Sequence, residues 1–264
     1  MDEKGRTIFI TGAASGIGRE TALLFSSKGW RVGAVDVDEA GLQRLAQEIG
    51  AAGDDRCWTA KLDVRDYAAW QERIRDFGAW SGWRMDALFN CAGIMKMGPF
   101  DQTPMAEHAR TVEVNILGVM NGVHASLELL KATRDAHVIS MCSASAVYGV
   151  PDLATYSASK FFVRGFTEAL NIELEPHGIW VTDLMPLYVD TPMVRSQTYR
   201  AGSLETFGAR LTPKEIAGLV WEAAHSRKVH WVPGAMLKAL NYLGGAMPFV
   251  SRPTMRLLDK RKAR

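Results

Sequence analysis

Cysteine is scarce in this 264-residue chain, and long apolar runs are absent from it. Cys57, Cys91 and Cys142 lie in apolar neighbourhoods without Cys-x-x-Cys spacing, which indicates reduced core thiols in a reducing compartment. No stretch approaches the roughly 18 unbroken apolar residues of a membrane span, and the first residues lack the apolar segment of a secretory signal. These absences predict a soluble, cytoplasmic protein.

The chain also lacks an excess of charge of one sign. Its formal net charge is +2, and acidic and basic residues are mixed through most of its length, which gives no nucleic-acid-binding signature. Six histidines are scattered, and the nearest pair, His225 and His230, has no carboxylate or thiolate cluster beside it. We therefore expect no metal site.

The C-terminus is the exception to this even charge distribution. Residues 252–264 contain six Lys or Arg residues and one Asp. We therefore separate an apolar and basic extension, residues 234–264, from a main domain of residues 1–233. Residues 237–250, followed by the basic end, could cover a site, join two copies or touch an anionic membrane surface, and a short apolar helix packed on its own protein is the favoured reading. For the basic end itself, a solvated and frayed terminus is the favoured reading.

Short apolar or β-branched runs alternate with longer helical patterns along the main domain. This alternation predicts an α/β fold, a doubly wound parallel sheet of about seven strands with helices on both faces. Ligands of such sheets bind at the carboxyl ends of the strands, so residues just after each strand are candidates for chemistry. The strands are expected at residues 6–11, 31–36, 56–62, 85–90, 136–141, 179–184 and 229–232.

Thr11 to Gly18 form a glycine-rich turn between the first expected strand and a helix-like stretch. Residues without side chains at a helix N-terminus let a phosphate approach unpaired backbone N–H groups and the positive end of the helix dipole. The turn therefore predicts a dinucleotide pyrophosphate site, although its Gly-x-x-x-Gly-x-Gly spacing differs from the Gly-x-Gly-x-x-Gly fingerprint. A glycine-rich turn without a ligand is the alternative. The candidate contacts are Gly12, Ser15, Gly16, Ile17 and Gly18.

Asp36 ends the second expected strand, at about the distance from the glycines where a dinucleotide-binding protein places an acidic residue. Its carboxylate can accept hydrogen bonds from an adenosine ribose and repels a 2′-phosphate. No Lys or Arg stands between Ala13 and Ser15 or directly after Asp36. NAD is therefore expected as the cofactor in preference to NADP.

Two further strand ends carry small or polar residues that could border the adenosine half of a dinucleotide. Asp63 and Val64 follow the third strand, where Asp63 could equally cap a helix. The turn Asn90-Cys91-Ala92-Gly93 follows the fourth strand, and it is either a plain turn or one small enough to pass beneath a ribose. The expected cofactor contacts here are Asp63, Val64, Asn90, Ala92 and Gly93.

Tyr156 and Lys160 stand four positions apart at the start of an expected helix, so both side chains lie on one face. A free phenol titrates near pH 10, and a neighbouring ammonium would lower that pKa toward working pH, which makes an acid–base catalyst. Ser143, thirteen residues earlier and just past the fifth strand, could hold a substrate oxygen. An ordinary surface pair of Tyr and Lys is the alternative.

Together these motifs resemble the short-chain dehydrogenase/reductase family over residues 6–232. The resemblance implies a Rossmann-type domain in which Tyr156 exchanges a proton with the alcohol or carbonyl oxygen and Ser143 orients that oxygen. It implies that Lys160 holds the nicotinamide ribose and lowers the pKa of Tyr156, and that Asn115 positions a water linking Lys160 to solvent. It also implies a homodimer or homotetramer built through the helices near 104–133 and 155–177. The motifs that carry it are Thr11 to Gly18, Asp36, Asp63-Val64, Asn90-Cys91-Ala92-Gly93, Asn115, Ser143 and Tyr156 with Lys160.

One departure from the family pattern follows the sixth strand, where Leu187 replaces the Gly that usually follows the proline. Leu adopts a positive φ less readily than Gly, so the backbone beside the nicotinamide is expected to run differently or to carry a hydrophobic wall. Pro186, Val189 and Thr191 are candidate cofactor contacts, and for Thr191 this role and a purely structural one are equally open.

Methionines and other apolar residues gather near the expected catalytic residues, without an Arg or Lys placed to grip a carboxylate or phosphate. A hydrophobic secondary alcohol or its ketone is therefore the expected substrate of an NAD-dependent dehydrogenase or carbonyl reductase. A catalytically silent dinucleotide sensor or scaffold is a second reading, but it would not need Ser143, Tyr156 and Lys160. A sugar-nucleotide epimerase or dehydratase is a third, but its glycine spacing and larger C-terminal domain are not seen. The expected substrate wall comprises Met95, Met97, Met141, Met185, Leu187, Tyr188 and Met193.

Overall fold

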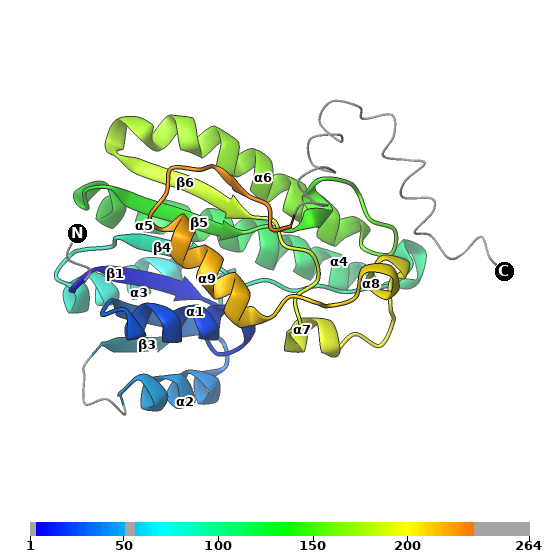
Figure 1. Ribbon diagram of the computed structural model, residues 1–264, viewed down its shortest axis with the longest axis horizontal. Coiled ribbons are helices and arrows are strands. Elements are labelled where there is room, and N and C mark those ends of the chain that lie inside the picture. Colours follow the sequence, from blue (N-terminus) through cyan, green and yellow to red (C-terminus); the bar gives the residue numbers. More distant parts are fainter. Residues whose placement is uncertain (1–3, 51–55, 235–264) are drawn as a thin grey trace.

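A computed structural model describes residues 4–50 and 56–234, and a seven-stranded parallel sheet forms its centre (Figure 1). The strand order is β3-β2-β1-β4-β5-β6-β7, so the direction of winding reverses between β1 and β4. The predicted doubly wound α/β fold is therefore confirmed. The strands are β1 (Thr7–Thr11), β2 (Arg31–Asp36), β3 (Cys57–Lys61), β4 (Ala87–Asn90), β5 (Ala136–Met141), β6 (Ile179–Leu184) and β7 (His230–Trp231).

The central strands β1, β4, β5 and β6 are mostly apolar and buried along nearly their whole length, because both faces of the sheet are covered. In β1, Ile8, Phe9 and Ile10 are all fully buried. Ile8 and Ile10 pack into the core on one face, and Phe9 packs into the core on the other, as the alternation of side chains along a strand requires. The continuous apolar runs that predicted these strands are thus the consequence of two cores.

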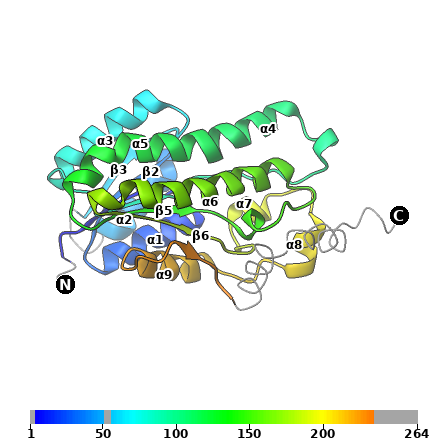
Figure 2. The ribbon, with the colours of Figure 1, turned by 90° about the horizontal axis from the view of Figure 1, so that it is seen from above.

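Helices cover the sheet in two layers, which Figure 2 shows on either side of the strands. Phe25 of α1 and Leu45 of α2 belong to one core, and Trp70 of α3 and Leu130 of α5 belong to the other. The first layer contains α1 (Gly16–Ser27), α2 (Glu39–Gly50) and α9 (Pro213–Ala223). The second contains α3 (Tyr67–Ser81), α5 (Gly118–Ala132) and α6 (Ala154–Leu174).

The two long helices expected near 104–133 and 155–177 are present, but the first is not uniform. It consists of α4 (Met105–Val112), a π-helical turn (Glu113–Leu117) and α5. The wider turn places the buried side chain of Asn115 at the junction. The short helices α7 (Pro192–Arg195) and α8 (Gly202–Phe207) lie beyond the carboxyl ends of the strands, on the side to which the arrowheads point in Figure 1.

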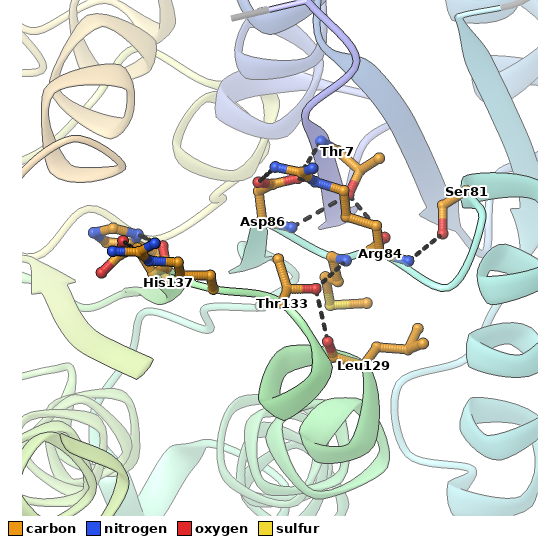
Figure 3. Close-up of polar contacts among 10 residues, drawn as sticks. Thr7, Ser81, Arg84, Asp86, Leu129, Thr133 and His137 are labelled. Carbon is orange, nitrogen blue, oxygen red and sulfur yellow. Dashed lines mark hydrogen bonds and ion pairs between the residues drawn. The ribbon is translucent and has the colours of Figure 1, made fainter. Parts of the chain in front are cut away.

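A polar cluster fastens the opposite edge of the sheet, where the strands begin (Figure 3). The buried carboxylate of Asp86 accepts hydrogen bonds from the Thr7 amide at 2.9 Å and from the Arg84 guanidinium at 2.6 and 2.7 Å. Nearby, the Thr133 hydroxyl accepts a hydrogen bond from the Met85 amide at 3.0 Å. Because each partner satisfies a buried polar group, β1, β4 and the end of α5 are held in one register.

Within the described ranges, no helix is long and apolar enough to cross a membrane. The proposed boundary after residue 233 and the roles weighed for residues 234–264 concern a segment that, apart from Gly234, lies outside the described residues.

His137 on β5 is a buried imidazole at the same edge of the sheet, and Figure 3 shows it beside the polar cluster. Its two ring nitrogens face the carbonyl oxygens of Asp135 at 3.1 Å and Ser226 at 3.3 Å. Burial lowers the pKa of His137 to about 4, because removal from water disfavours the imidazolium more than the two carbonyls stabilise it. His137 is therefore protonated at a lower pH in the folded protein than in the unfolded chain.

We predict that His137 makes the fold acid-sensitive. Above about pH 6.5 the imidazole is neutral in both the folded and the unfolded chain, and the full stability is present. As the pH falls from 6.5 toward 4, the unfolded chain binds the proton first, and the loss in the free energy of unfolding approaches about 3 kcal/mol. Denaturant melts at several pH values should show a weaker dependence on pH in His137→Asn than in the unsubstituted protein. The same substitution at the exposed His177 serves as the control. Identical pH dependences of His137→Asn and the unsubstituted protein would contradict the prediction.

Candidate active site

A cavity of about 750 Å³ lies at the carboxyl ends of the strands, where the order of the sheet reverses. Its walls come from the β1–α1 turn, the ends of β2 to β6, the first turns of α6, and α7 and α8. A sheet of this topology opens a crevice there because neighbouring connections leave toward opposite faces. Most of the predicted site residues therefore meet in one space.

The glycine turn between β1 and α1 forms one end of the cavity. A Cβ atom on Gly18 would lie 2.2 Å from the carbonyl oxygen of Gly12, so only glycine permits this packing. Ser15 precedes the first residue of α1, and its side chain does not cap the helix. The first N–H groups of α1 thus receive no hydrogen bond from that side chain, and they are available to an anion. The residues of this turn that line the cavity are Gly12, Ser15, Gly16, Ile17 and Gly18.

Thr11 joins this turn to the end of β4. Its hydroxyl oxygen accepts hydrogen bonds from the amides of Cys91 and Ala92, both at 3.0 Å. This contact aligns the glycine turn with the small-residue turn beside it. Thr11 belongs to the predicted glycine-turn motif, but this role was not predicted for it, although a hydroxyl residue next to a conformationally free turn is a signal for such a bond.

Asp36 at the end of β2 lines the cavity beside the glycine turn. One carboxylate oxygen accepts a hydrogen bond from the Ala14 amide and the other from the Asp38 amide, both at 3.0 Å. The side chain is thereby fixed in position next to the glycine turn. This is the geometry expected of a group that selects between ribose hydroxyls and a phosphate.

Asp63 after β3 is paired with a cation. Its carboxylate accepts hydrogen bonds from the guanidinium of Arg65, the shortest at 2.6 Å, and these bonds lower the pKa of Asp63. Arg65 also lies 3.4 Å from Glu113. Asp63 does not cap α3, because Asp66 does so, and the capping alternative is therefore wrong. Asp63, Val64, Arg65 and also Arg110 line the cavity, and these two cations were missed in the sequence.

The turn after β4 contributes Ala92 and Gly93 to the cavity wall, but Asn90 lies behind that wall. Asn90 is only 3 % exposed, and its side-chain nitrogen has no hydrogen-bond partner within the described residues. Gly93 leaves room for its neighbours, since a Cβ there would lie 3.3 Å from the Asn115 side-chain oxygen and 3.9 Å from Lys160 Nζ. The geometry thus supports a contact role for Ala92 and Gly93 rather than for Asn90.

Ser143, Tyr156 and Lys160 face the same part of the cavity. Ser143 precedes a 3₁₀ turn (Ala144–Ala146) after β5, and its hydroxyl is near enough to the Tyr156 phenol to lower the pKa of that phenol. Tyr156 and Lys160 stand on the first turns of α6, and Lys160 Nζ lies 5.5 Å from the centre of the Tyr156 ring. The predicted common face of the helix is therefore present.

The predicted lowering of the pKa of Tyr156 by Lys160 is not what the structure shows. Enclosure of the phenol by surrounding protein raises the pKa of Tyr156, and the nearby Ser143 hydroxyl opposes this only in part. The buried Lys160 donates instead to the Met141 carbonyl at 2.7 Å, and burial lowers the pKa of Lys160. Helical spacing brought the two side chains together but did not direct the ammonium at the phenolic oxygen.

Asn115 is fully buried in the π-helical turn and does not line the cavity. Its side-chain nitrogen donates to the Ile94 carbonyl at 2.9 Å and to the Ser159 hydroxyl at 3.1 Å, and its oxygen accepts from the Ile94 amide at 2.8 Å. These bonds hold the chain after β4 against α6. The side chain of Asn115 therefore braces the wall near Lys160 and makes no direct contact with the cavity.

The loop after β6 brings Pro186, Leu187, Val189 and Thr191 to the cavity. Leu187 is not among the non-glycine residues of positive φ in the described chain, and it packs beside a small apolar cluster. Of the two expected consequences of this Leu, the hydrophobic wall is the one observed. The Thr191 hydroxyl donates to the Val189 carbonyl at 3.3 Å, and a Cβ on Gly16 would lie 3.4 Å from its methyl group.

The remaining end of the cavity is apolar. Met141 and Met193 line it together with Met95, which is nearly buried in a cluster with Leu153 and Leu204. Met97 lies in the same cluster behind the wall, and Met185 packs in a separate core, so neither lines the cavity as expected.

Gln197 fastens this end of the cavity and was missed in the sequence. Its side-chain nitrogen donates to the carbonyls of Met95 and Met193, both at 2.9 Å, and its oxygen accepts from the Met97 amide at 3.0 Å. One amide thus joins the turn after β4 to the loop around α7. No short-range pattern reveals the bonds to Met95 and Met97, because these residues stand about a hundred positions from Gln197 in the sequence.

Comparison with known proteins agrees with this geometry. Residues 6–201 match the family model described as short chain dehydrogenase. The putative oxidoreductase SadH of Mycobacterium tuberculosis is 33 % identical over 257 residues, which cover 92 % of this chain and 91 % of that protein. The mitochondrial borneol dehydrogenase of Lavandula x intermedia is 30 % identical over 217 residues, 81 % of each chain.

Solved structures show the same fold. A short chain dehydrogenase/reductase from Burkholderia phymatum, crystallised in complex with NAD, superposes with a TM-score of 0.85 at 26 % identity, covering 95 % of this chain and 96 % of that one. The fold, the site at the reversal of the sheet and these matches lead to one conclusion. The chain is an oxidoreductase with a site for a nicotinamide cofactor, and it belongs to the short-chain dehydrogenase/reductase family.

Proposed function

We propose that this protein interconverts a hydrophobic secondary alcohol and its ketone with NAD as the cofactor. The observation that carries the proposal is that Ser143 and Tyr156 line the same cavity as the glycine turn and Asp36, with the Ser143 hydroxyl near enough to the phenol to act on its pKa. A proton-transferring group and a dinucleotide cradle are the two parts that such a reaction needs from the protein. NAD bound there would supply a carbon that accepts or donates hydride.

The residues at the cavity would bind the substrate oxygen, transfer the proton and hold the cofactor ribose. The Ser143 hydroxyl would hold the substrate oxygen, and Tyr156 would give a proton to that oxygen or take one from it. Because enclosure raises the pKa of Tyr156, the phenol carries its proton at neutral pH and is ready to protonate a ketone oxygen. Lys160, which lines the cavity, would bind a ribose hydroxyl.

The residues around the glycine turn fit a dinucleotide. Close backbone packing at Gly18 and the uncapped start of α1 suit a pyrophosphate, and the fixed carboxylate of Asp36 suits ribose hydroxyls. Asp36 also carries the proposed preference for NAD over NADP. Asn115 is proposed to act from behind the wall, and Thr191 to contact the cofactor from the loop after β6.

The substrate class is proposed from the apolar end of the cavity. The cations that line the cavity in the described chain are Arg65, Arg110 and Lys160; Arg65 is paired with Asp63, and Lys160 donates to the Met141 carbonyl. An uncharged, hydrophobic molecule suits such a wall. The name of the plant relative, borneol dehydrogenase, refers to a molecule of this kind. A silent dinucleotide sensor is the alternative, and the paired hydroxyls of Ser143 and Tyr156 favour the enzyme.

Replacement of the proposed acid–base group gives the first test. In Tyr156→Phe, kcat for ketone reduction should fall by about 10²–10⁴, because the ring remains but the proton donor is lost. NADH binding, followed by fluorescence titration, should be nearly unchanged. Tyr67→Phe removes a hydroxyl outside the cavity and serves as the matched control. Turnover of Tyr156→Phe within a few fold of the control would refute the role.

Neutralising Asp36 tests the cofactor preference. Asp36→Asn keeps an oxygen near the Ala14 amide but removes the charge that would repel a 2′-phosphate. The Kd for NADPH divided by the Kd for NADH should fall by roughly tenfold, about 1.4 kcal/mol. Asp38→Asn changes the net charge equally from a position that does not line the cavity. A tighter affinity for NADP than for NAD in the unsubstituted protein would contradict the preference itself.

We also propose that the protein is a homodimer or homotetramer joined through the long helices. Leu117 and Met120 near the start of α5 are 45 % and 40 % exposed, and Phe161 and Ile172 on α6 are 44 % and 73 % exposed. Apolar side chains gathered on helix surfaces favour burial against a partner. Light scattering coupled to size exclusion should give a mass of two or four chains, reduced in Met120→Glu. A monomeric mass for the unsubstituted protein at micromolar concentration would exclude the assembly.

A further inference from the structure

A second pair of hydroxyl groups lies in the otherwise apolar end of the cavity. The Tyr188 hydroxyl and the Ser203 hydroxyl are 2.7 Å apart, and both residues line the cavity. Tyr188 belongs to the loop after β6, and Ser203 belongs to α8. Two separate segments therefore bring one polar pair to the place where the wall is otherwise built of methionine, leucine and valine.

The pair holds more hydrogen-bonding capacity than the protein uses. Two hydroxyl groups carry two donor hydrogens, and the bond between them uses one. Within the described residues, neither side-chain oxygen has a further hydrogen bond. Ser203 is only 4 % exposed, and burial raises the pKa of Tyr188, so both groups keep their hydrogens. A buried donor without an acceptor destabilises the fold unless a ligand or water supplies the acceptor.

The pair of Tyr188 and Ser203 lines the same cavity as the proposed catalytic hydroxyls of Ser143 and Tyr156. Tyr156 and Tyr188 pack against the same apolar cluster, which includes Met95 and Leu153. The two phenols are also close enough to interact electrostatically. A single small molecule can therefore contact Tyr156 with one oxygen and the pair at Tyr188 with another.

We propose that Tyr188 and Ser203 bind a second, uncharged oxygen of the substrate. This inference rests on the proposed function and narrows it. The substrate is an apolar molecule with two oxygen functions: the carbinol or carbonyl that reacts at Ser143 and Tyr156, and a hydroxyl, carbonyl or ether oxygen that accepts a hydrogen bond from the pair. A carboxylate or phosphate at the second position is disfavoured, because the charged group that acts on Tyr188 is the carboxylate of Asp152 and not a Lys or Arg.

A purely structural role for the pair is the competing explanation. The loop that carries Ser203 has other fastenings, however, since Gln197 makes three hydrogen bonds and Tyr199 donates to Asp152 at 3.3 Å. A structural pair would affect all substrates alike when it is removed. A binding pair would affect only substrates that carry the second oxygen, and this difference separates the two explanations.

Matched ketones give the test. Cyclohexanones with a methoxy group at ring position 2, 3 or 4 are compared with those carrying an ethyl group at the same position, because the two groups have nearly equal shape and differ in the ether oxygen. With NADH, the unsubstituted protein should prefer the methoxy ketone over its ethyl partner by about tenfold in kcat/KM at one or more positions. The double variant Tyr188→Phe with Ser203→Ala should bring that ratio to about one while the ethyl ketone is still reduced.

Tyr199→Phe is the matched control, because it removes a phenolic hydroxyl from the same loop at a residue that does not line the cavity. It should keep the preference of the unsubstituted protein. Equal kcat/KM values for methoxy and ethyl ketones at every position, or a preference that survives in the double variant, would overturn the inference.

A second readout separates the inference from the proposed function. The midpoint of thermal unfolding in the presence of NADH should rise more with the preferred methoxy ketone than with its ethyl partner, and this difference should vanish in the double variant. If no ketone is reduced at all, the proposed function fails, and the binding difference still decides the role of Tyr188 and Ser203. Equal thermal shifts with both ketones would then overturn the inference as well.

Discussion

The close packing of backbone at the end of β1 is the constraint on which the rest of the site depends. Gly18 lies against the carbonyl of Gly12, which lets α1 begin directly above the strand. Thr11 then fixes the turn after β4 through two amides. Because β1 and β4 are neighbours at the reversal of the sheet, this packing sets both the position and the width of the cavity.

Much of the fold could be predicted from the sequence, because parallel strands covered on both faces must be apolar throughout. The run around Ile8 has this property, and all seven strands lie within the ranges expected from the sequence. The spacing of Tyr156 and Lys160 predicted a shared helix face for a similar reason, since helical geometry is local. The glycine turn could be read because a backbone carbonyl leaves no room for a side chain at Gly18.

The features that could not be predicted depend on contacts between distant segments. Arg65 and Arg110 reach the cavity from different elements, and Gln197 binds residues about a hundred positions away. The pKa of Tyr156 was wrongly predicted because local spacing shows a nearby cation but not the degree of enclosure, which here dominates. The pairing of Tyr188 with Ser203 is likewise set by how the loop around α8 folds back on β6.

The bonds of Gln197 have a consequence for how the chamber can vary. One side-chain amide joins the turn after β4 to the loop around α7, so these two walls cannot shift independently. An insertion or deletion in either segment displaces the other wall as well. The shape of the chamber therefore changes as a unit, and a shift in the range of molecules it admits requires compensating changes on both sides of this amide.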